Sequence, residues 1–202
     1  MSFDLYFYKQ KDSSTTKDSV TTYLNINIPG EHTNTGQWVY ENLDTGVYFY
    51  FESTGLDINK DTPTEPFENF ENLNISFSLN FMRPDFFGIE AFKFVEELLQ
   101  ALDLFVFNPQ RNIELPVREK GACLFDSWQK GNKWASIDHF KGIDACFIPA
   151  SVSNKLWKYN FNRFKLQEKL GKEYFFRKFS SSGIKRTTKS VQWRAGFSTY
   201  LR

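Results

Sequence analysis

The residues of this sequence whose types suit chemistry gather in and around the stretch DSWQKGNKWASIDHF, residues 126–140. It contains two tryptophans, two acids, two lysines and one of the two histidines of the chain. Cys123 precedes it and Cys146 follows it. A thiol, an imidazole and a carboxylate that meet in space can perform nucleophilic catalysis. One hypothesis is therefore a small enzyme with a site near Cys123, His139 and Asp138.

Two other interpretations of the same stretch involve no catalysis. In the first, Trp128 and Trp134 fill the seam between the two halves of the chain while His139 hydrogen-bonds locally. In the second, the tryptophans, Asp138 and His139 border a surface patch or shallow pocket, because Trp is a frequent anchor of protein interfaces. The six-residue spacing of the tryptophans does not fit one helical face, and Gly131 is expected to break a helix here. The candidate binding residues are Trp128, Trp134, Asp138, His139, Trp157 and Arg163.

Motifs for cofactors and metals are not found in the sequence. His32 and His139 are far apart and the cysteines form no CxxC pair, which disfavours a zinc site. The acidic loop that begins at Asp57 starts like an EF-hand but has Thr62 where that motif needs glycine. No phosphate-binding glycine loop or GxSxG elbow occurs. We expect no metal, no cofactor and no catalytic residues, and we interpret both cysteines as small buried side chains.

The charge of the chain is divided sharply along the sequence. Residues 1–107 contain 6 Lys and Arg against 17 Asp and Glu, whereas residues 108–202 contain 19 against 7. We therefore expect an acidic half, residues 1–110, and a basic half, residues 111–202, packed as one domain. The two halves could attract each other, or one of the charged faces could meet a partner.

Secondary-structure patterns predict an α+β protein. Residues 3–9, 37–42, 47–53, 73–81 and 104–107 have the composition or the period of strands, and segments near 16–24 and 85–102 have helical patterns. Gly46 suits the turn of a β-hairpin. The predicted helix at 85–102 places Ile89, Phe92, Val95, Leu98, Leu99 and Leu102 on one face. The resulting order β-α-β-β-β-α-β predicts an antiparallel sheet with helices on one face.

A C-terminal β-α-β unit is expected to follow. Its parts are a strand at 145–150, a long helix from about residue 151 to Gly171, and a strand at 172–179. Residues after 180 fit no period. The opening residues 1–10 predict a strand rather than a secretory signal, and no run of about 18 apolar residues occurs. We therefore expect a cytoplasmic protein with no membrane contact.

Four segments carry a resemblance to a known kind of protein: MSFDLYFYK, QWVYENLDTGVYFYFE, FSLNFMRPDFFGIEAFKFVEEL and SWQKGNKWA. Together they resemble an uncharacterised family of bacterial cytosolic proteins, over most of the chain up to about residue 178. Many small α+β proteins of that kind are immunity or accessory proteins of polymorphic-toxin systems. The resemblance implies an immunity-like role and a protein partner such as a toxin. It carries over no functional residues.

These observations favour a non-enzymatic binding protein that meets a protein partner through charged surfaces. The enzyme hypothesis is the first alternative. Nucleic-acid binding is the second, because aromatic residues interleave with basic ones in the C-terminal half, as in proteins that bind single strands. The residues that would carry it are Lys165, Lys169, Arg177, Lys178, Lys185 and Arg186.

Overall fold

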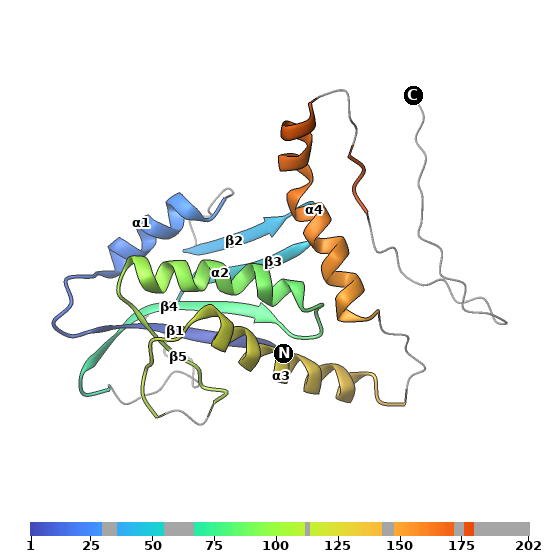
Figure 1. Cartoon of the computed structure of the whole chain (residues 1–202). Helices are drawn as coiled ribbons and strands as arrows, with labels where there is room; N and C mark the ends of the chain where they lie inside the picture. Colours follow the sequence, from blue (N-terminus) through green and yellow to red (C-terminus); the bar gives the residue numbers. More distant parts are fainter. Residues whose placement is uncertain (30–35, 55–66, 112–113, 143–147, 172–175, 180–202) are drawn as a thin grey trace. The chain divides into compact units, whose positions relative to one another are not determined.

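The computed structural model describes residues 1–29, 36–54, 67–111, 114–142, 148–171 and 176–179 (Figure 1). Its first seven elements follow the predicted order β-α-β-β-β-α-β, and two further helices come after them. They are β1 (Ser2–Gln10), α1 (Lys17–Asn27), β2 (Gln37–Asn42), β3 (Val47–Ser53), β4 (Phe70–Asn80), α2 (Phe86–Ala101), β5 (Phe105–Phe107), α3 (Gly121–His139) and α4 (Ala150–Leu170). The α+β class is therefore confirmed.

Five described strands form one antiparallel sheet in the order β2-β3-β4-β1-β5. Phe77 of β4 lies opposite both Leu5 and Phe51, so apolar side chains from three central strands share one face. This face is fully buried, and Phe77 meets Phe92 of α2 at 5.8 Å between ring centroids. Helices cover this face, as the alternating pattern of the strands predicts (Figure 1).

Two local signals shape the N-terminal part of this layer. Gly46 ends the β2–β3 turn with a φ of +75°, and its amide donates to the Asn42 carbonyl at 2.7 Å. Helix α1 begins with a capping box in which Thr16 and Ser19 satisfy each other's backbone amides. Val20 and Leu24 of α1 are buried in the common core. The hairpin turn therefore lies where Gly46 predicts it, and local capping chemistry fixes the start of α1 at Thr16.

Helix α2 is rotated slightly from its predicted orientation. Phe92 and Val95 are buried as expected, but Ile89 is 39% exposed and its neighbour Glu90 is 3% exposed. The helix directs Glu90 toward the β2–β3 hairpin, whose Tyr40 hydroxyl donates to the carboxylate at 2.5 Å. A buried carboxylate is tolerated where donors replace its lost water. The prediction for Ile89 was wrong because the sequence pattern does not reveal these donors.

Alkaline pH is expected to destabilise the sheet through Tyr8 of β1. Burial, with a smaller effect of Tyr6, raises the pKa of Tyr8 from 10.0 to about 12. The unfolded chain therefore loses this proton at a lower pH than the folded chain, and the free energy of unfolding falls between pH 10 and pH 12. Urea unfolding followed by circular dichroism at pH 8 and at pH 11 tests this. Tyr8→Phe should show a smaller pH dependence than the wild type, and an equal dependence would exclude Tyr8 as a source.

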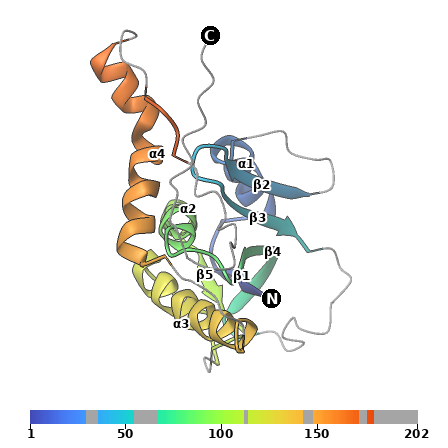
Figure 2. The same ribbon diagram turned by 90° about the vertical axis from the view of Figure 1, so that its right-hand side faces the viewer.

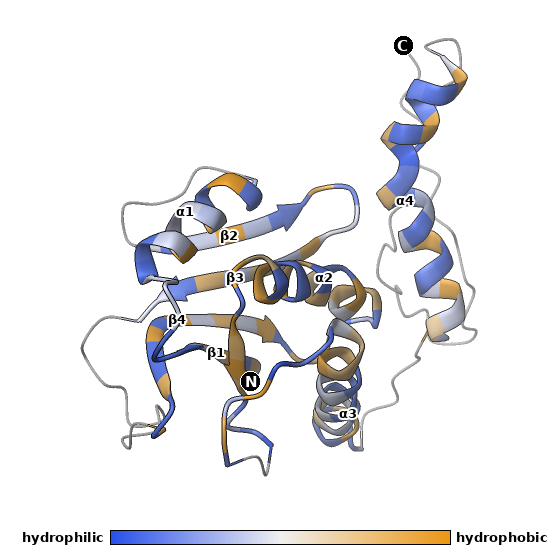
Figure 3. Cartoon of the chain, turned by 60° about the vertical axis from the view of Figure 1, so that its left-hand side comes forward, coloured by the Kyte–Doolittle hydropathy of each residue, from blue (hydrophilic) through white to orange (hydrophobic). Residues whose placement is uncertain are grey.

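The chain divides into two compact units, Met1–Asn154 and Lys155–Arg202. The charge boundary at residue 110 therefore falls inside the first unit, where α3 packs on α2 through Trp128 and Phe92. The second unit contains most of α4. Figure 3 shows apolar residues concentrated on α2 and the central strands, and mixed polarity along α4.

The predicted C-terminal β-α-β unit is only partly present. The long helix is confirmed as α4, and Gly171 follows it with a φ of +91°, as expected of a C-terminal glycine. Ile148 and Pro149 form no strand, and neither do residues 176–179. Residues 176–179 instead bond to α4: Asn160 and Arg163 side chains donate to the carbonyls of Phe179 and Phe176. Residues 145–147, 172–175 and the segment after residue 180 lie outside the described residues.

Candidate functional site

Helix α3 contains most of the residues singled out in the sequence. It runs unbroken from Gly121 to His139, so the expectation that Gly131 breaks it was wrong. A Cβ at Gly131 would lie 2.9 Å from the Phe81 ring. Glycine at this position lets that ring approach the helix backbone closely. Its presence here reflects packing between elements rather than a helix end.

The two tryptophans of α3 have opposite environments. Trp128 is fully buried between α2 and α3, whereas Trp134 is 63% exposed. The seam interpretation is therefore confirmed for Trp128 and wrong for Trp134. Six residues along a helix correspond to a rotation of about 240°, which turns the second indole to solvent. Trp128 lies too deep to touch a partner and is removed from the candidate binding residues.

The cysteine, histidine and aspartate of the enzyme hypothesis do not meet. Cys123 and His139 lie at opposite ends of α3, sixteen residues apart, which corresponds to about 24 Å along a helix. Asp138 and His139 are both exposed. Cys123 is also exposed, so its interpretation as a buried side chain was wrong. Cys146 lies outside the described residues. The geometry of α3 excludes a site that uses Cys123 with His139.

One stripe of α3 is exposed and carries both basic and apolar side chains. Lys130, Lys133, Trp134 and Ile137 follow one another at helical spacing, so they lie within roughly one third of the helix circumference. Ile137 is 62% exposed, close to the value for Trp134, and both lysines are exposed. Lys141 follows just beyond the helix and is exposed too. We name these five residues the α3 stripe.

Figure 2 shows α3 as a straight helix whose N-terminal part lies alongside the sheet layer. The buried side of the helix is formed by Gly121, Leu124, Trp128, Asn132 and Ala135. Asn132 holds the connection between β4 and α2, because its amide donates to the Arg83 carbonyl at 2.7 Å and its oxygen accepts from the Arg83 amide at 3.1 Å. These contacts fix the rotation of α3 and direct the α3 stripe outward.

The remaining candidate binding residues belong to α4. Trp157 is half-buried and contacts the Phe161 ring at 5.4 Å. Arg163 is half-buried, bonds to the Phe176 carbonyl and lies 4.6 Å from the Phe164 ring centroid. Arg163 thus joins α4 to residues 176–179 within the second unit, whereas Trp157 contacts a neighbour on its own helix. Their place in a binding surface remains a prediction.

The basic residues of the nucleic-acid hypothesis are partly described. Lys165 and Lys169 of α4 and Lys178 are exposed, and Arg177 is half-buried. Phe164 beside them is 60% exposed. Lys185 and Arg186 lie outside the described residues. The described part of this surface is therefore basic, and Phe179 beside Lys178 is exposed as well, at 40%.

A buried polar cluster was not foreseen from the sequence. Beside Tyr40, the Asn42 amide donates to Glu90 at 2.7 Å and the Thr45 hydroxyl donates at 3.1 Å. Burial, then the bond to Glu90 and its charge, raises the pKa of Tyr40 above its ordinary value, so the phenol stays protonated and donates. The cluster is closed by packing and joins α2 to the hairpin. We interpret it as structural.

Two common features, a metal-binding cluster and a membrane-spanning helix, are not found among the described residues. In the described ranges no group of three or more His, Cys, Asp or Glu side chains could hold a metal ion. Among the helices described, none has the length and apolar character needed to cross a bilayer. The geometry thus defines an α+β protein with an exposed basic and apolar helix stripe.

Comparisons with family models, with curated proteins and with solved structures found no significant match to this chain.

Proposed function

We propose that this chain is a non-enzymatic binding protein that holds an acidic protein partner on the α3 stripe. The observation that carries the proposal is the exposure of Trp134 and Ile137, 63% and 62%, one turn apart on a helix. Large apolar side chains exposed together are frequent anchors of interfaces, and tryptophan is the residue most enriched among them.

The charges around these two residues indicate the chemistry of the partner. Lys130, Lys133 and Lys141 surround the apolar pair, and Asp138 is the single acid among residues 130–141. A surface rimmed by positive charges attracts a negatively charged surface and speeds association with it. An acidic surface with an apolar pocket for the indole would fit this stripe. The resemblance to immunity proteins makes a toxin the partner class that we propose.

Trp134→Ala is expected to weaken partner binding by at least about tenfold, because it removes the central apolar anchor. A photo-crosslinking amino acid placed at position 134 in the native cells identifies the partner, and the same label at Ile26 of α1 is the control. Ile26 is 74% exposed and lies on another element. A protein that cross-links to the label at position 134 but not to the label at position 26 is then purified. Its affinity for wild type, Trp134→Ala and Ile26→Ala is measured by calorimetry.

The proposal predicts that Ile26→Ala binds like the wild type and that rising salt weakens binding. A captured protein that binds Trp134→Ala as tightly as wild type contradicts the proposal. Capture that nuclease treatment abolishes would favour the nucleic-acid alternative instead. Cross-links found only to a second copy of the chain would contradict a different protein as the partner and would indicate that the α3 stripe mediates self-association.

A further inference from the structure

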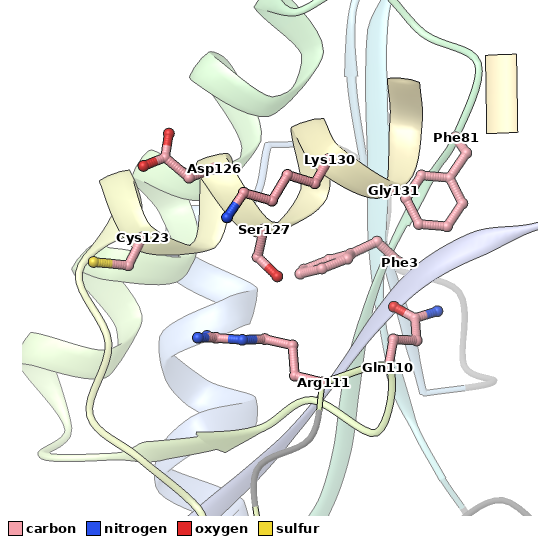
Figure 4. A pocket seen from close by; sticks show the side chains of 9 residues that line it. All are labelled: Phe3, Phe81, Gln110, Arg111, Cys123, Asp126, Ser127, Lys130 and Gly131. Atoms are coloured by element: carbon pink, nitrogen blue, oxygen red, sulfur yellow. The ribbon is translucent and has the colours of Figure 1, made fainter. Parts of the chain in front are cut away.

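A pocket of about 480 Å³ opens beside the N-terminal half of α3, within the first unit. Five of its lining residues come from α3, and the others come from β1, the end of β4 and the segment after β5 (Figure 4). They are Phe3, Phe81, Gln110, Arg111, Cys123, Asp126, Ser127, Lys130 and Gly131. This volume suits a small molecule.

One wall of the pocket is a hydrogen-bonded turn that presents two polar side chains. Asn108 is buried, and its side-chain oxygen and its carbonyl accept the amides of Gln110 and Arg111, respectively. The Gln110 side chain donates to the Ser2 carbonyl at 2.6 Å. Glu119, whose side chain is 11% exposed, accepts from Nη1 of Arg111. A guanidinium has five donors, and Glu119 is the one side-chain partner of Arg111 among the described residues, so this bond orients Arg111 while other N–H groups can meet a ligand.

The opposite wall is the face of α3 that continues into the α3 stripe. Figure 4 shows the Ser127 hydroxyl and the Arg111 guanidinium directed into the space between the two walls, and the Lys130 side chain running back along the helix toward Ser127. Within the described residues, Lys130 forms no ion pair. In this view the Asp126 side chain points away from the space between the two walls, whereas Ser127 points into it.

The floor of the pocket is aromatic. Phe3 is 2% exposed and meets Phe81 at 6.4 Å between ring centroids, with the rings nearly perpendicular. The Phe81 ring in turn lies against the helix backbone at Gly131. The pocket therefore combines an apolar surface with a guanidinium, an ammonium and a hydroxyl, and the Asp126 carboxylate is the one acidic group among its lining residues. Such a mixture of an apolar wall with a few placed polar groups is typical of small-molecule sites.

We propose that this pocket binds a small organic anion with a flat apolar body, such as an aryl carboxylate or an aryl phosphate. Lys130 and Arg111 hold the negative group, Ser127 donates a hydrogen bond to it, and the apolar body lies against Phe81, whose ring rests on the buried Phe3. A guanidinium and an ammonium are the two side-chain groups that bind carboxylates and phosphates best. The site adjoins the proposed protein interface and shares Lys130 with it, whereas Arg111 and Ser127 do not belong to the α3 stripe.

Cys123 on the rim of the pocket allows a direct test. Iodoacetate and iodoacetamide both alkylate a thiolate: the sulfur–carbon bond forms, iodide leaves, and the thiol proton goes to the buffer. The first reagent is an anion and the second is neutral. The rate of alkylation by each reagent is measured by mass spectrometry of the peptide that contains Cys123, so reaction at Cys146 does not interfere. The ratio of the two rates therefore reports how strongly the site attracts an anion.

Lys130→Gln is expected to lower the rate with iodoacetate about fivefold and to leave the rate with iodoacetamide nearly unchanged. Lys133→Gln is the matched control, since it removes the same charge one turn away on the same helix but does not line the pocket. Both lysines are exposed, so both variants should fold. If the two variants behave alike, the pocket has no specific role in attracting the anion.

Protection by a reversible ligand separates binding in the pocket from a mere local charge. Phenyl phosphate and benzoate, added at constant ionic strength, should slow alkylation of Cys123 by iodoacetamide with a saturating dependence on concentration. Inorganic phosphate and benzyl alcohol, which lack the ring and the charge respectively, should protect far less. The relative protection by phenyl phosphate and benzoate shows which anion is preferred. Absence of saturating protection by either would overturn the proposal, and the result does not depend on any protein partner.

Discussion

Trp128→Ala is expected to lower the free energy of unfolding by about 3–5 kcal/mol, the usual cost of removing a large buried aromatic side chain. The indole is fully buried and lies over Phe92 of α2 and Phe125 of α3. A Cβ at Gly88 would lie 2.7 Å from it, which shows how closely the ring approaches α2. Because Trp128 is the largest buried side chain of α3, the alanine variant should also loosen the packing of α3 on α2.

Urea unfolding at neutral pH, followed by far-ultraviolet circular dichroism, measures this effect. Trp134→Ala in the same helix is the matched control and should change the free energy of unfolding by less than about 0.5 kcal/mol, since its side chain is largely exposed. Trp128→Phe should cost less than Trp128→Ala because the phenyl ring fills part of the space. Equal stability of Trp128→Ala and Trp134→Ala would mean that α3 does not dock on α2 as described.

The contrast between the tryptophans explains how far the sequence predicts this fold. The sheet, the hairpin and α2 follow from strong local patterns, and these predictions are confirmed. Helix α3 was missed because its buried positions include Gly121, Asn132 and Ala135 beside Leu124 and Trp128. Small and polar residues on the buried side weaken the apolar period that predicts a helix. The spacing of these buried positions is nevertheless helical, and this spacing is the signal in the sequence that could have predicted α3.

The candidate site shows the same limit. The sequence singled out the segment that forms α3 as a candidate site, but it could not tell which of its residues face the core and which face solvent. The pocket was missed because two of its lining residues, Phe3 and Phe81, are far from α3 along the chain, and only the fold brings them together with the helix. Long-range contacts of this kind leave no local period. The rotation of α3, fixed by Asn132, therefore decides which of its residues face solvent.

Tyr40→Phe is expected to lower the free energy of unfolding by about 1.5–3 kcal/mol, the range for a hydrogen bond to a charged group. Glu90 is 3% exposed, and its carboxylate receives the Tyr40 hydroxyl at 2.5 Å. Removal of this donor leaves a buried negative charge with fewer partners, which costs more than the loss of an exposed bond. Tyr50→Phe on the neighbouring strand, where the side chain is half-buried, is the control and should be nearly neutral.

A double-mutant cycle with Glu90→Gln separates the bond from general effects of each change. Glu90→Gln removes the charge. The glutamine amide has one accepting oxygen and one N–H₂ donor in place of two accepting oxygens, so it cannot accept from Tyr40, Asn42 and Thr45 as the carboxylate does. The two single changes share one contact, so the double variant should be more stable than additivity predicts, by about 1 kcal/mol or more. Urea unfolding of the four proteins at pH 7 gives this term. An additive result would show that Tyr40 and Glu90 stabilise the protein independently, and the buried cluster would then owe its stability to Asn42 and Thr45.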